Sequence, residues 1–305
     1  HRPSPSCNRS AADDPKRPVL PGGVVDDYTV LELLHSGDRP LSDVKTHVRT
    51  CPLCDADKPE GLPRYGDSQW RMVRCGRCAF VYVLEAPDYD ELTENLAWEK
   101  TATVEKKRRE KRWPRARAIA KKFKRQFSFA RQDQNDLLCK VLPQGRVLDV
   151  GCGDGRVPEP FVPYGIEISE GLWRRADEKM RERGGYAVNA SALEGLSAFE
   201  EKAFDGIVMR SYLEHEDRPR EVLQRAYAKL KPGGVVFVRV PNFGSLNARL
   251  LGPRWCGIRL PDHLNYFTNA QMRAMALRVG YRYRLLNRWT LPTDDNIKAL
   301  LIRAA

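Results

Sequence analysis

The second half of the chain alternates short apolar runs with longer segments in which apolar residues recur at helical spacing. Residues 147–150, 164–168 and 204–209 are short, mostly apolar runs bounded by glycine or polar residues, as is typical of strands buried on both faces of a sheet. Residues 172–183 and 219–230 carry apolar side chains at helical spacing, which predicts helices that cover such a sheet. This alternation predicts an α/β fold with a mostly parallel sheet. Further strands are predicted at 186–188, 235–240, 281–288 and 296–303, and a further helix at 269–280.

The first half of the chain lacks this alternation. Its beginning is rich in Pro, Ser, Asp and Arg without apolar periodicity, so we expect a disordered or loosely packed tail with one short helix at 27–35. A mostly helical segment at 91–124 is interrupted at Trp113-Pro114, because proline cannot donate a helical hydrogen bond. We therefore divide the chain into a tail (1–46), a cysteine-bearing module (47–85), a helical, strongly basic connector (86–140) and an α/β domain (141–305).

Composition and charge restrict the class of protein. The chain has 305 residues, of which 42% are hydrophobic, enough for at least one sizeable core. The longest apolar run, Ala79–Leu84, is far shorter than the ~20 residues of a membrane-spanning helix, and the N-terminus lacks the layout of a signal peptide. We therefore expect a cytoplasmic protein without a membrane partner. The formal net charge of +12 is matched by residues 106–131 alone, a charge run that could be a solvated helix face or could attract an anionic partner.

Four of the cysteines form two CxxC pairs. Two such knuckles can turn four thiolates toward one ion, in the tetrahedral arrangement that zinc accepts. A site closed by four sulfurs keeps no open position, so the metal would be structural and would fold a module too small to fold alone. The runs between and after the pairs, 70–74 and 80–83, predict the strands of a zinc ribbon. The predicted zinc ligands are Cys51, Cys54, Cys75 and Cys78.

The run 147–150 leads directly into a glycine-spaced turn, the arrangement that a nucleotide-like cofactor needs. Gly151, Gly153 and Gly155 allow backbone N–H groups to approach a ligand closely. The next predicted strand ends in Glu167, an acid that could accept hydrogen bonds from ribose hydroxyls. Arg156 stands where a dinucleotide-binding GxGxxG motif would have its third glycine.

These features together resemble motif I and the following acid of class I S-adenosylmethionine-dependent methyltransferases. The resemblance covers about half of the chain and includes Leu213-Glu214-His215, Pro232-Gly233-Gly234, Pro241-Asn242 and a P-x-H-x-x-x-F-[ST] element from Pro261. It implies a Rossmann-like sheet with a C-terminal antiparallel hairpin. With the preceding ribbon, the chain resembles bacterial enzymes that methylate sugars or other small metabolites. The resemblance implies cofactor contacts from Asp149, Gly151, Cys152, Gly153, Gly155, Glu167, Ile168, Ser191, Ala192 and Arg210.

One segment departs from the family pattern. Where the first helix of the α/β domain is expected, Pro158, Pro160 and Pro163 exclude a regular helix of normal length. We expect either a truncated first helix or a chain that lacks residues at this point. The family also commonly has an acid after the third strand to hold the adenine amino group, and here Ser191 takes that position.

The acceptor side is predicted from the segments after the fifth strand. His263 is the candidate general base, because histidine can take a proton near neutral pH from an attacking nucleophile. The alternative is that His263 orients its loop or caps the following helix. Asn242 and Tyr266 belong to the same family elements and complete the predicted catalytic set.

The predicted function is methyl transfer from S-adenosylmethionine to a small molecule, a sugar or an anionic metabolite. A second interpretation is an RNA methyltransferase in which the ribbon and the basic segment 106–131 bind phosphates. A third is a cofactor-binding protein without catalysis.

Overall fold

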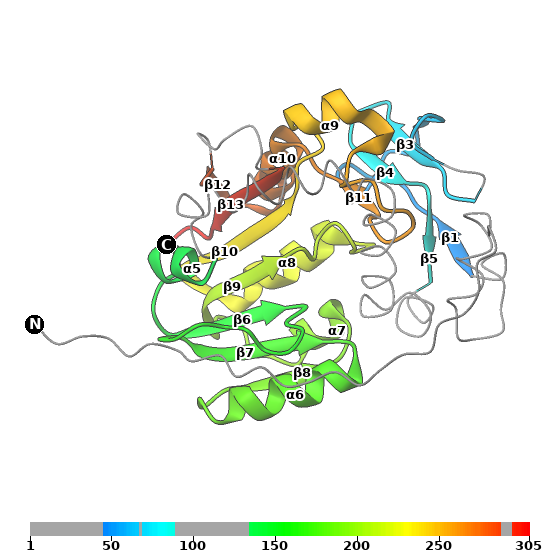
Figure 1. Ribbon diagram of the computed structural model, residues 1–305. Helices are drawn as coiled ribbons and strands as arrows, with labels where there is room; N and C mark the ends of the chain where they lie inside the picture. Colours follow the sequence, from blue (N-terminus) through cyan, green and yellow to red (C-terminus); the bar gives the residue numbers. More distant parts are fainter. Residues whose placement is uncertain (1–44, 67–68, 89–133, 288–294) are drawn as a thin grey trace, which may run out of the picture. The chain divides into compact units, whose positions relative to one another are not determined.

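The computed structural model describes residues 45–66, 69–88, 134–287 and 295–305 (Figure 1). The short helix predicted at 27–35 and the basic helical segment predicted at 91–124 lie outside the described residues.

A seven-stranded sheet forms the centre of the α/β domain, in the order β12-β13-β10-β9-β6-β7-β8. β13 runs antiparallel to β10 and β12, and the pairs among β10, β9, β6, β7 and β8 are parallel. The predicted Rossmann-like sheet with a C-terminal antiparallel hairpin is therefore confirmed. Its strands are β6 (Arg146–Val150), β7 (Val162–Glu167), β8 (Tyr186–Asn189), β9 (Phe204–Arg210), β10 (Leu230–Pro241), β12 (Arg282–Leu285) and β13 (Asn296–Ile302).

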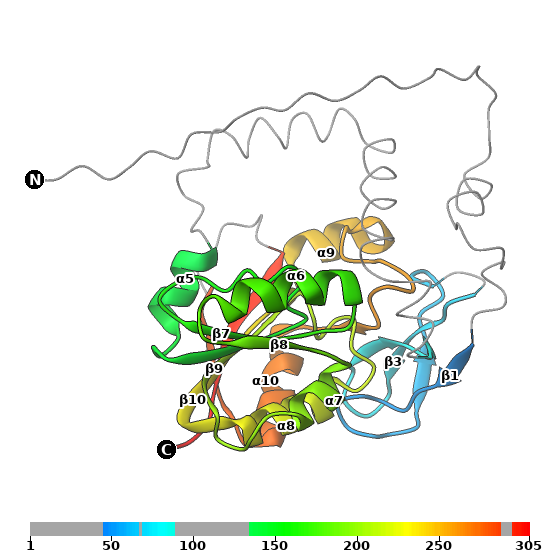
Figure 2. The same cartoon turned by 90° about the horizontal axis from the view of Figure 1, so that it is seen from below.

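Helices cover both faces of this sheet, as Figure 2 shows. Alternate residues of a strand point to opposite faces, so Val147 joins one buried cluster and Leu148 the other. The cluster of Val147 includes residues of α5 (Gln134–Val141) and α6 (Glu170–Arg181). The cluster of Leu148 includes residues of α7 (Ala192–Ser197), α8 (Pro219–Lys229) and α10 (Asn269–Val279).

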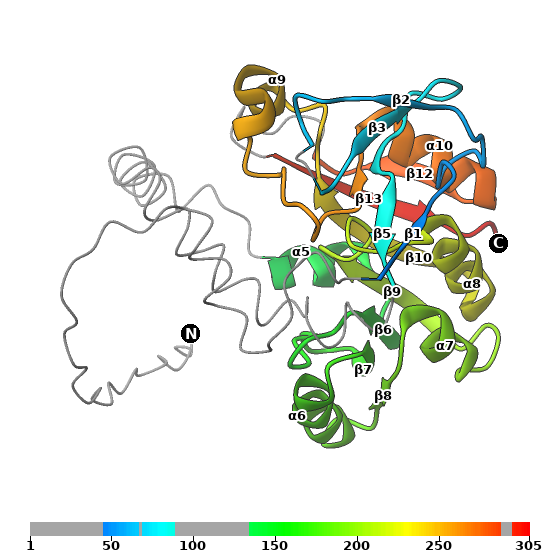
Figure 3. The same ribbon diagram turned by 90° about the vertical axis from the view of Figure 1, so that its right-hand side faces the viewer.

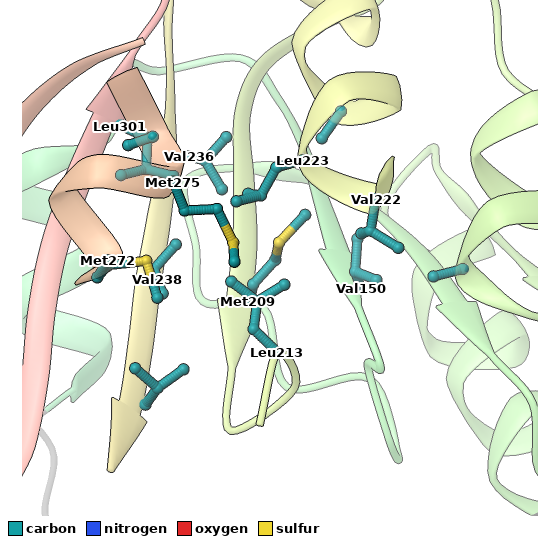
Figure 4. Packing of buried hydrophobic residues seen from close by; sticks show 14 of the residues in the cluster. Val150, Met209, Leu213, Val222, Leu223, Val236, Val238, Met272, Met275 and Leu301 are labelled. Atoms are coloured by element: carbon teal, nitrogen blue, oxygen red, sulfur yellow. The ribbon is translucent and has the colours of Figure 1, made fainter. Parts of the chain in front are cut away.

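The second of these clusters is built from side chains of widely separated segments (Figure 4). Met272 and Met275 of α10 point toward Val236 and Val238 of β10, and all four are fully buried. Burying one such side chain contributes roughly 1.5–3 kcal/mol, so this packing holds α10 firmly on the sheet.

The described residues 151–161, between β6 and β7, contain turns and no helix. The prolines explain this, because a proline inside a helix removes a hydrogen bond and clashes with the preceding turn. The backbone carbonyls that a helix would satisfy accept bonds from the Arg183 guanidinium instead, at Val157 (2.5 Å), Pro158 (3.0 Å) and Phe161 (2.7 Å). The first helix is thus replaced by a loop that Arg183, two residues after the end of α6, holds in place.

The cysteine-bearing module, hereafter the ribbon (residues 47–85), contributes to a second sheet (Figure 3). The predicted strands are present as β3 (Met72–Cys75) and β4 (Val81–Val83), and β2 (Pro59–Gly61) pairs with β3. On the other side of β4 lies β11 (Asn265–Tyr266), a strand that the sequence pattern did not predict. A strand from the α/β domain therefore completes the ribbon's sheet. β1 (Thr46–Val48), β5 (Glu85–Pro87), α9 (Leu246–Leu251) and the 3-10 helix Gly252–Arg254 complete the described elements.

Among the residues that the structure describes, no helix is both long enough and apolar enough to cross a lipid bilayer.

Candidate functional site

The functional residues gather where the parallel strands end. β7 and β8 lie to one side of β6, and β9 and β10 lie to the other, so the strand order reverses at β6. In open α/β sheets, ligands bind outside the carboxyl ends of the strands at such a switch point. The segments that follow β6, β7, β9 and β10 meet at this edge.

The glycine loop (residues 151–155) follows β6. Gly151 and Gly153 have φ angles of 70° and 57°, which glycine adopts without strain. A Cβ at Gly151 would lie 2.7 Å from the ring of Tyr212, so glycine is needed there for close packing. A Cβ at Gly153 would meet no described atom within 4 Å, and this open space beside the backbone would accommodate a ligand. Cys152, between the two, is buried.

Glu167, the predicted ribose ligand, ends β7 and faces the glycine loop. Its two carboxylate oxygens accept hydrogen bonds from Gly153 N (2.8 Å) and Ser169 N (3.0 Å). Each oxygen can accept a second bond, so the carboxylate can hold the loop and still bind a hydroxyl. The neighbouring Ile168 is half-buried, between this carboxylate and the start of α6.

Asp149 and Arg210 form a buried ion pair beneath the loop. Arg210 Nη2 lies 2.8 Å from Asp149 Oδ2 and also donates to the carbonyl of Arg156 at 3.1 Å. Burial raises the pKa of the Asp149 carboxyl more than the Arg210 charge lowers it. The pair links the ends of β6 and β9 and therefore fixes the floor of the site.

Ser191 and Ala192, predicted to lie near adenine, begin α7. The Ser191 hydroxyl donates to Glu194 Oε2 at 2.7 Å and accepts from Glu194 N at 3.2 Å, which is a capping box. The Ser-x-x-Glu pattern could have predicted this helix start from the sequence. The side chain of Ser191 is thus engaged in the cap, and Ala192 is buried.

The turn that follows β9, residues 211–217, carries the Leu-Glu-His motif and is called the post-β9 turn. Tyr212 lies against Gly151 and donates to Glu216 Oε2 at 2.5 Å. Glu216 is buried, and its other oxygen accepts from Arg218 N at 2.9 Å. Tyr212 was not among the predicted site residues, because nothing in its sequence context indicates contact with the glycine loop.

His215 projects from the post-β9 turn and is paired with Asp262. Its Nδ1 donates to the Asp262 carbonyl at 2.7 Å and lies 3.4 Å from Asp262 Oδ1. This leaves Nε2 as the proton-accepting nitrogen of the neutral ring. Burial lowers the pKa of the imidazole, but the hydrogen bond and charge of Asp262 and the charge of Glu214 raise it more, so it lies above 6.5. The His215 side chain is 23% exposed.

His263, the predicted general base, lies beside His215 with the ring centroids 4.8 Å apart and the planes nearly perpendicular. It is only 4% exposed, and its Nδ1 donates to the Gly257 carbonyl at 2.9 Å. Burial and the neighbouring His215 charge lower its pKa well below 6.5. Of the two rings, His215 is therefore more accessible and more basic.

Glu214, His215 and His263 form what we call the imidazole cluster, with potential ligand atoms within 4.8 Å of one another. Within the described part of the chain, Glu214 Oε2 is buried without a hydrogen-bond partner. Charges of both signs act on this cluster: Arg239 and Arg259 contribute positive charge, and Glu214 and Asp262 contribute negative charge. At His215 the carboxylates of Asp262 and Glu214 outweigh the other effects and raise the pKa, so this ring is suited to accept a proton.

Asn242 and Tyr266, the other predicted catalytic residues, contact neighbouring residues of their own segments and of the ring cluster around Phe243. Asn242 follows β10, and its Oδ1 accepts from Gly244 N at 3.0 Å within a turn. Tyr266 is buried in β11 and packs against Phe243 with ring centroids 5.6 Å apart.

The predicted zinc ligands Cys51, Cys54, Cys75 and Cys78, hereafter the cysteine cluster, lie together in the ribbon. Their sulfurs are within 4.8 Å of one another, and the pairs Cys51–Cys78 and Cys54–Cys75 are 3.5 Å apart. Four sulfurs at about 2.3 Å from one ion in a tetrahedron would be nearly this close. The cluster can hold a zinc ion with little movement.

The basic segment 106–131, on which the RNA interpretation rests, lies outside the described residues.

Three comparisons with known proteins found similar sequences and structures. A family model described as a methyltransferase domain matches residues 106–286. The ubiquinone biosynthesis O-methyltransferase of Burkholderia pseudomallei is 33% identical over 181 residues, which are 52% of this chain and 78% of that protein. Its counterpart from Caulobacter vibrioides is 27% identical, covering 59% of this chain and 79% of that protein. A solved Thermotoga maritima structure, described as a SAM-dependent methyltransferase and possible histamine N-methyltransferase, is 19% identical with a TM-score of 0.45, covering 63% of this chain and 99% of that chain.

Proposed function

We propose a specific reaction for this chain, which belongs to the methyltransferase-domain family and is an S-adenosylmethionine-dependent methyltransferase. The chain methylates a hydroxyl group of a small sugar-like or anionic acceptor, and His215 accepts the proton of that hydroxyl group. The observation that carries the proposal is the pairing of His215 with Asp262 at the carboxyl edge of the sheet, on the turn that packs against the glycine loop.

The residues of the cofactor side fit S-adenosylmethionine. The open space beside Gly153 lets a ligand approach the backbone, and Glu167 has acceptor capacity for ribose hydroxyls. The buried Asp149–Arg210 pair keeps the strand ends fixed beneath them. When bound, this cofactor supplies an electrophilic methyl carbon, which an oxygen nucleophile attacks most readily after losing its proton.

Deprotonation of the acceptor is the step assigned to His215. Its Nδ1–H is held by the Asp262 carbonyl and carboxylate, so the ring has a fixed tautomer with Nε2 free to accept a proton. The negative charge of Asp262 stabilises the imidazolium that results. His263 packs edge-on against this ring and restricts its rotation, so we assign it a positioning role in place of the base predicted from the sequence.

The acceptor class is proposed on two grounds. Curated relatives are named ubiquinone biosynthesis O-methyltransferases, which supports a hydroxyl acceptor on a small molecule. The excess of positive charge over the chain supports an anionic or sugar-phosphate acceptor. RNA is the alternative anionic acceptor.

We further propose that the cysteine cluster binds one structural zinc ion. Four thiolates satisfy its coordination, so the ion would stabilise the ribbon and take no part in the reaction.

The function is tested with the full chain in two steps. Calorimetry measures S-adenosylmethionine binding, and radiolabelled methyl transfer is then followed with nucleotide-linked sugars, sugar phosphates, phenols and total RNA as acceptors. We expect binding of the cofactor and labelling of a hydroxyl-bearing small molecule. Labelling of RNA alone would replace the small-molecule proposal, and the absence of cofactor binding would contradict the proposal for the site.

A further inference from the structure

We propose that Arg49 of the ribbon is a positioning residue for the base, because it fastens the post-β9 turn that carries His215. The ribbon would then be part of the catalytic machinery and not only an appended module. This inference rests on the proposed function, since it concerns the placement of the proposed proton acceptor.

The Arg49 guanidinium is buried and makes polar contacts with three separate segments. Its Nε lies 2.8 Å from Asp217 Oδ1. Its Nη2 donates to the Asp217 carbonyl at 2.7 Å and to Asn265 Oδ1 at 2.9 Å. The other terminal nitrogen donates to the carbonyls of Val83 and Leu264, both at 3.3 Å. One side chain thus ties a ribbon strand, β11 and the end of the post-β9 turn together.

Asn265 extends this connection to the peptide groups around His215. Its Nδ2 donates to the carbonyls of Leu213 (2.9 Å) and Glu216 (2.6 Å), on either side of the histidine. The backbone N–H groups of Leu264 and Asn265 both donate to the Glu214 carbonyl, at 2.7 and 3.0 Å. The turn is therefore held through three carbonyls, those of residues 213, 214 and 216, and Arg49 fixes the side-chain amide that holds the first and the last of them.

The arrangement favours a positional role over a purely stabilising one. The Arg49 guanidinium is buried and pairs with the carboxylate of Asp217. Buried ion pairs contribute little net stability, because desolvation offsets much of their attraction. What the guanidinium does supply is a rigid set of donors in fixed directions, which lysine cannot reproduce.

A second arginine provides a matched control. Arg220 of α8 also joins the ribbon to the α/β domain, through Asp55 (2.7 Å to each oxygen) and the Leu53 carbonyl (3.2 Å). Within the described part of the chain, these bonds go to the first cysteine knuckle and not to the post-β9 turn. Arg220 therefore tests ribbon attachment without touching the turn.

The experiment compares Arg49→Met, Arg49→Lys and Arg220→Met in the full chain. Calorimetry measures the cofactor affinity, and mass spectrometry measures the zinc content. Turnover is followed by methyl transfer over a range of pH, and hydrogen exchange is measured at the backbone amides of residues 264 and 265. We expect Arg49→Met to lower kcat on the order of 10- to 100-fold, as misplacing a catalytic group does. Its cofactor affinity and zinc content should stay unchanged, and both amides should exchange faster. Arg49→Lys should be impaired in the same direction, and Arg220→Met should keep its kcat.

Two results would overturn the inference. One is an Arg49→Met protein with wild-type kcat and amide exchange, and the other is an equal loss of kcat in Arg49→Met and Arg220→Met. If Arg49→Met loses zinc or fails to fold, the Asp217→Asn variant is used in its place. This substitution removes the acidic partner of the Arg49–Asp217 ion pair, and it also removes the contact of Asp217 with His47. Unchanged exchange and kcat in Asp217→Asn would also overturn the inference. If the wild type methylates no acceptor, the proposed function fails, and amide exchange alone still decides whether Arg49 holds the turn.

Discussion

The cysteine cluster and the imidazole cluster each bring potential metal ligands within 4.8 Å of one another, but their surroundings differ. The cysteine cluster has four soft ligands, which can surround one ion completely. The imidazole cluster has one carboxylate and two rings, and arginine charges act on each of its three members. The two clusters therefore offer a metal ion different numbers and types of ligand.

The charges around each cluster decide its chemistry. At the imidazole cluster Asp262 and Glu214 raise the pKa of His215, which favours a proton on that ring, whereas the four thiolates of the cysteine cluster can surround one zinc ion completely. We accordingly expect one zinc ion per chain and not two, and the following predictions test this distinction.

The largest effect is expected from the cysteine cluster. Cys75→Ser should remove the zinc ion and unfold the ribbon, because binding of structural zinc supplies roughly 10–16 kcal/mol in small zinc modules. Metal content by mass spectrometry should fall from one zinc ion to none, and methyl transfer should be lost with it. The matched control is Cys139→Ser, since Cys139 is exposed and lies outside the cluster. Zinc retained in Cys75→Ser, or a second zinc ion in the wild type, would contradict the expectation that only the cysteine cluster binds zinc.

The next largest effect is expected at His215. His215→Asn keeps a polar group of similar reach but removes the basic nitrogen, so kcat should fall by about 10²–10⁴, the range of general base catalysis. Cofactor affinity and the single zinc ion should be unchanged. A parallel loss of cofactor binding would indicate that the substitution displaces the glycine loop through Tyr212, and it would contradict the assigned role.

A smaller effect is expected from the pH dependence of the reaction. A general base must be neutral, and the pKa of His215 lies above 6.5, so kcat/KM should fall as the pH decreases through a value above 6.5. Asp262→Asn removes the negative charge that raises this pKa, so the acidic limb should move to lower pH, with a lower kcat at its plateau. The Asp262 carboxyl has a pKa of about 2 and stays charged throughout this range. A wild-type limb well below 6.5 would instead assign the base to His263, whose pKa is lowered.

The cofactor side of the site was accessible from the sequence because its signals are local. The run 147–150, the glycine spacing and Glu167 lie close together in the chain. In the structure the backbone N–H of Gly153 donates a hydrogen bond to the Glu167 carboxylate. The capping box at Ser191 is equally local, because the Ser-x-x-Glu pattern by itself predicts a helix start.

The acceptor side could not be predicted in the same way, because its contacts join distant segments. Arg49 reaches Asp217 and Asn265, and neither contact leaves a periodic or spaced pattern in the sequence. The two-residue strand β11 exists only because β4 offers it an edge to pair with. His263 is suited to catalysis by residue type, whereas its burial and its bond to Gly257 support the positioning role that we propose for it.

The smallest effect is therefore expected at His263, which forms a matched pair with His215. His263→Asn should leave kcat within a few-fold of the wild type, because the base and its tautomer are set by Asp262 and not by this ring. It should lower the free energy of unfolding by about 0.5–3 kcal/mol, since the smaller side chain loses the packing of a buried ring against His215. Thermal unfolding and methyl transfer, measured side by side for both variants, separate the two roles. A loss of kcat in His263→Asn as large as in His215→Asn, with the fold intact, would reverse the assignment and make the more buried ring the base.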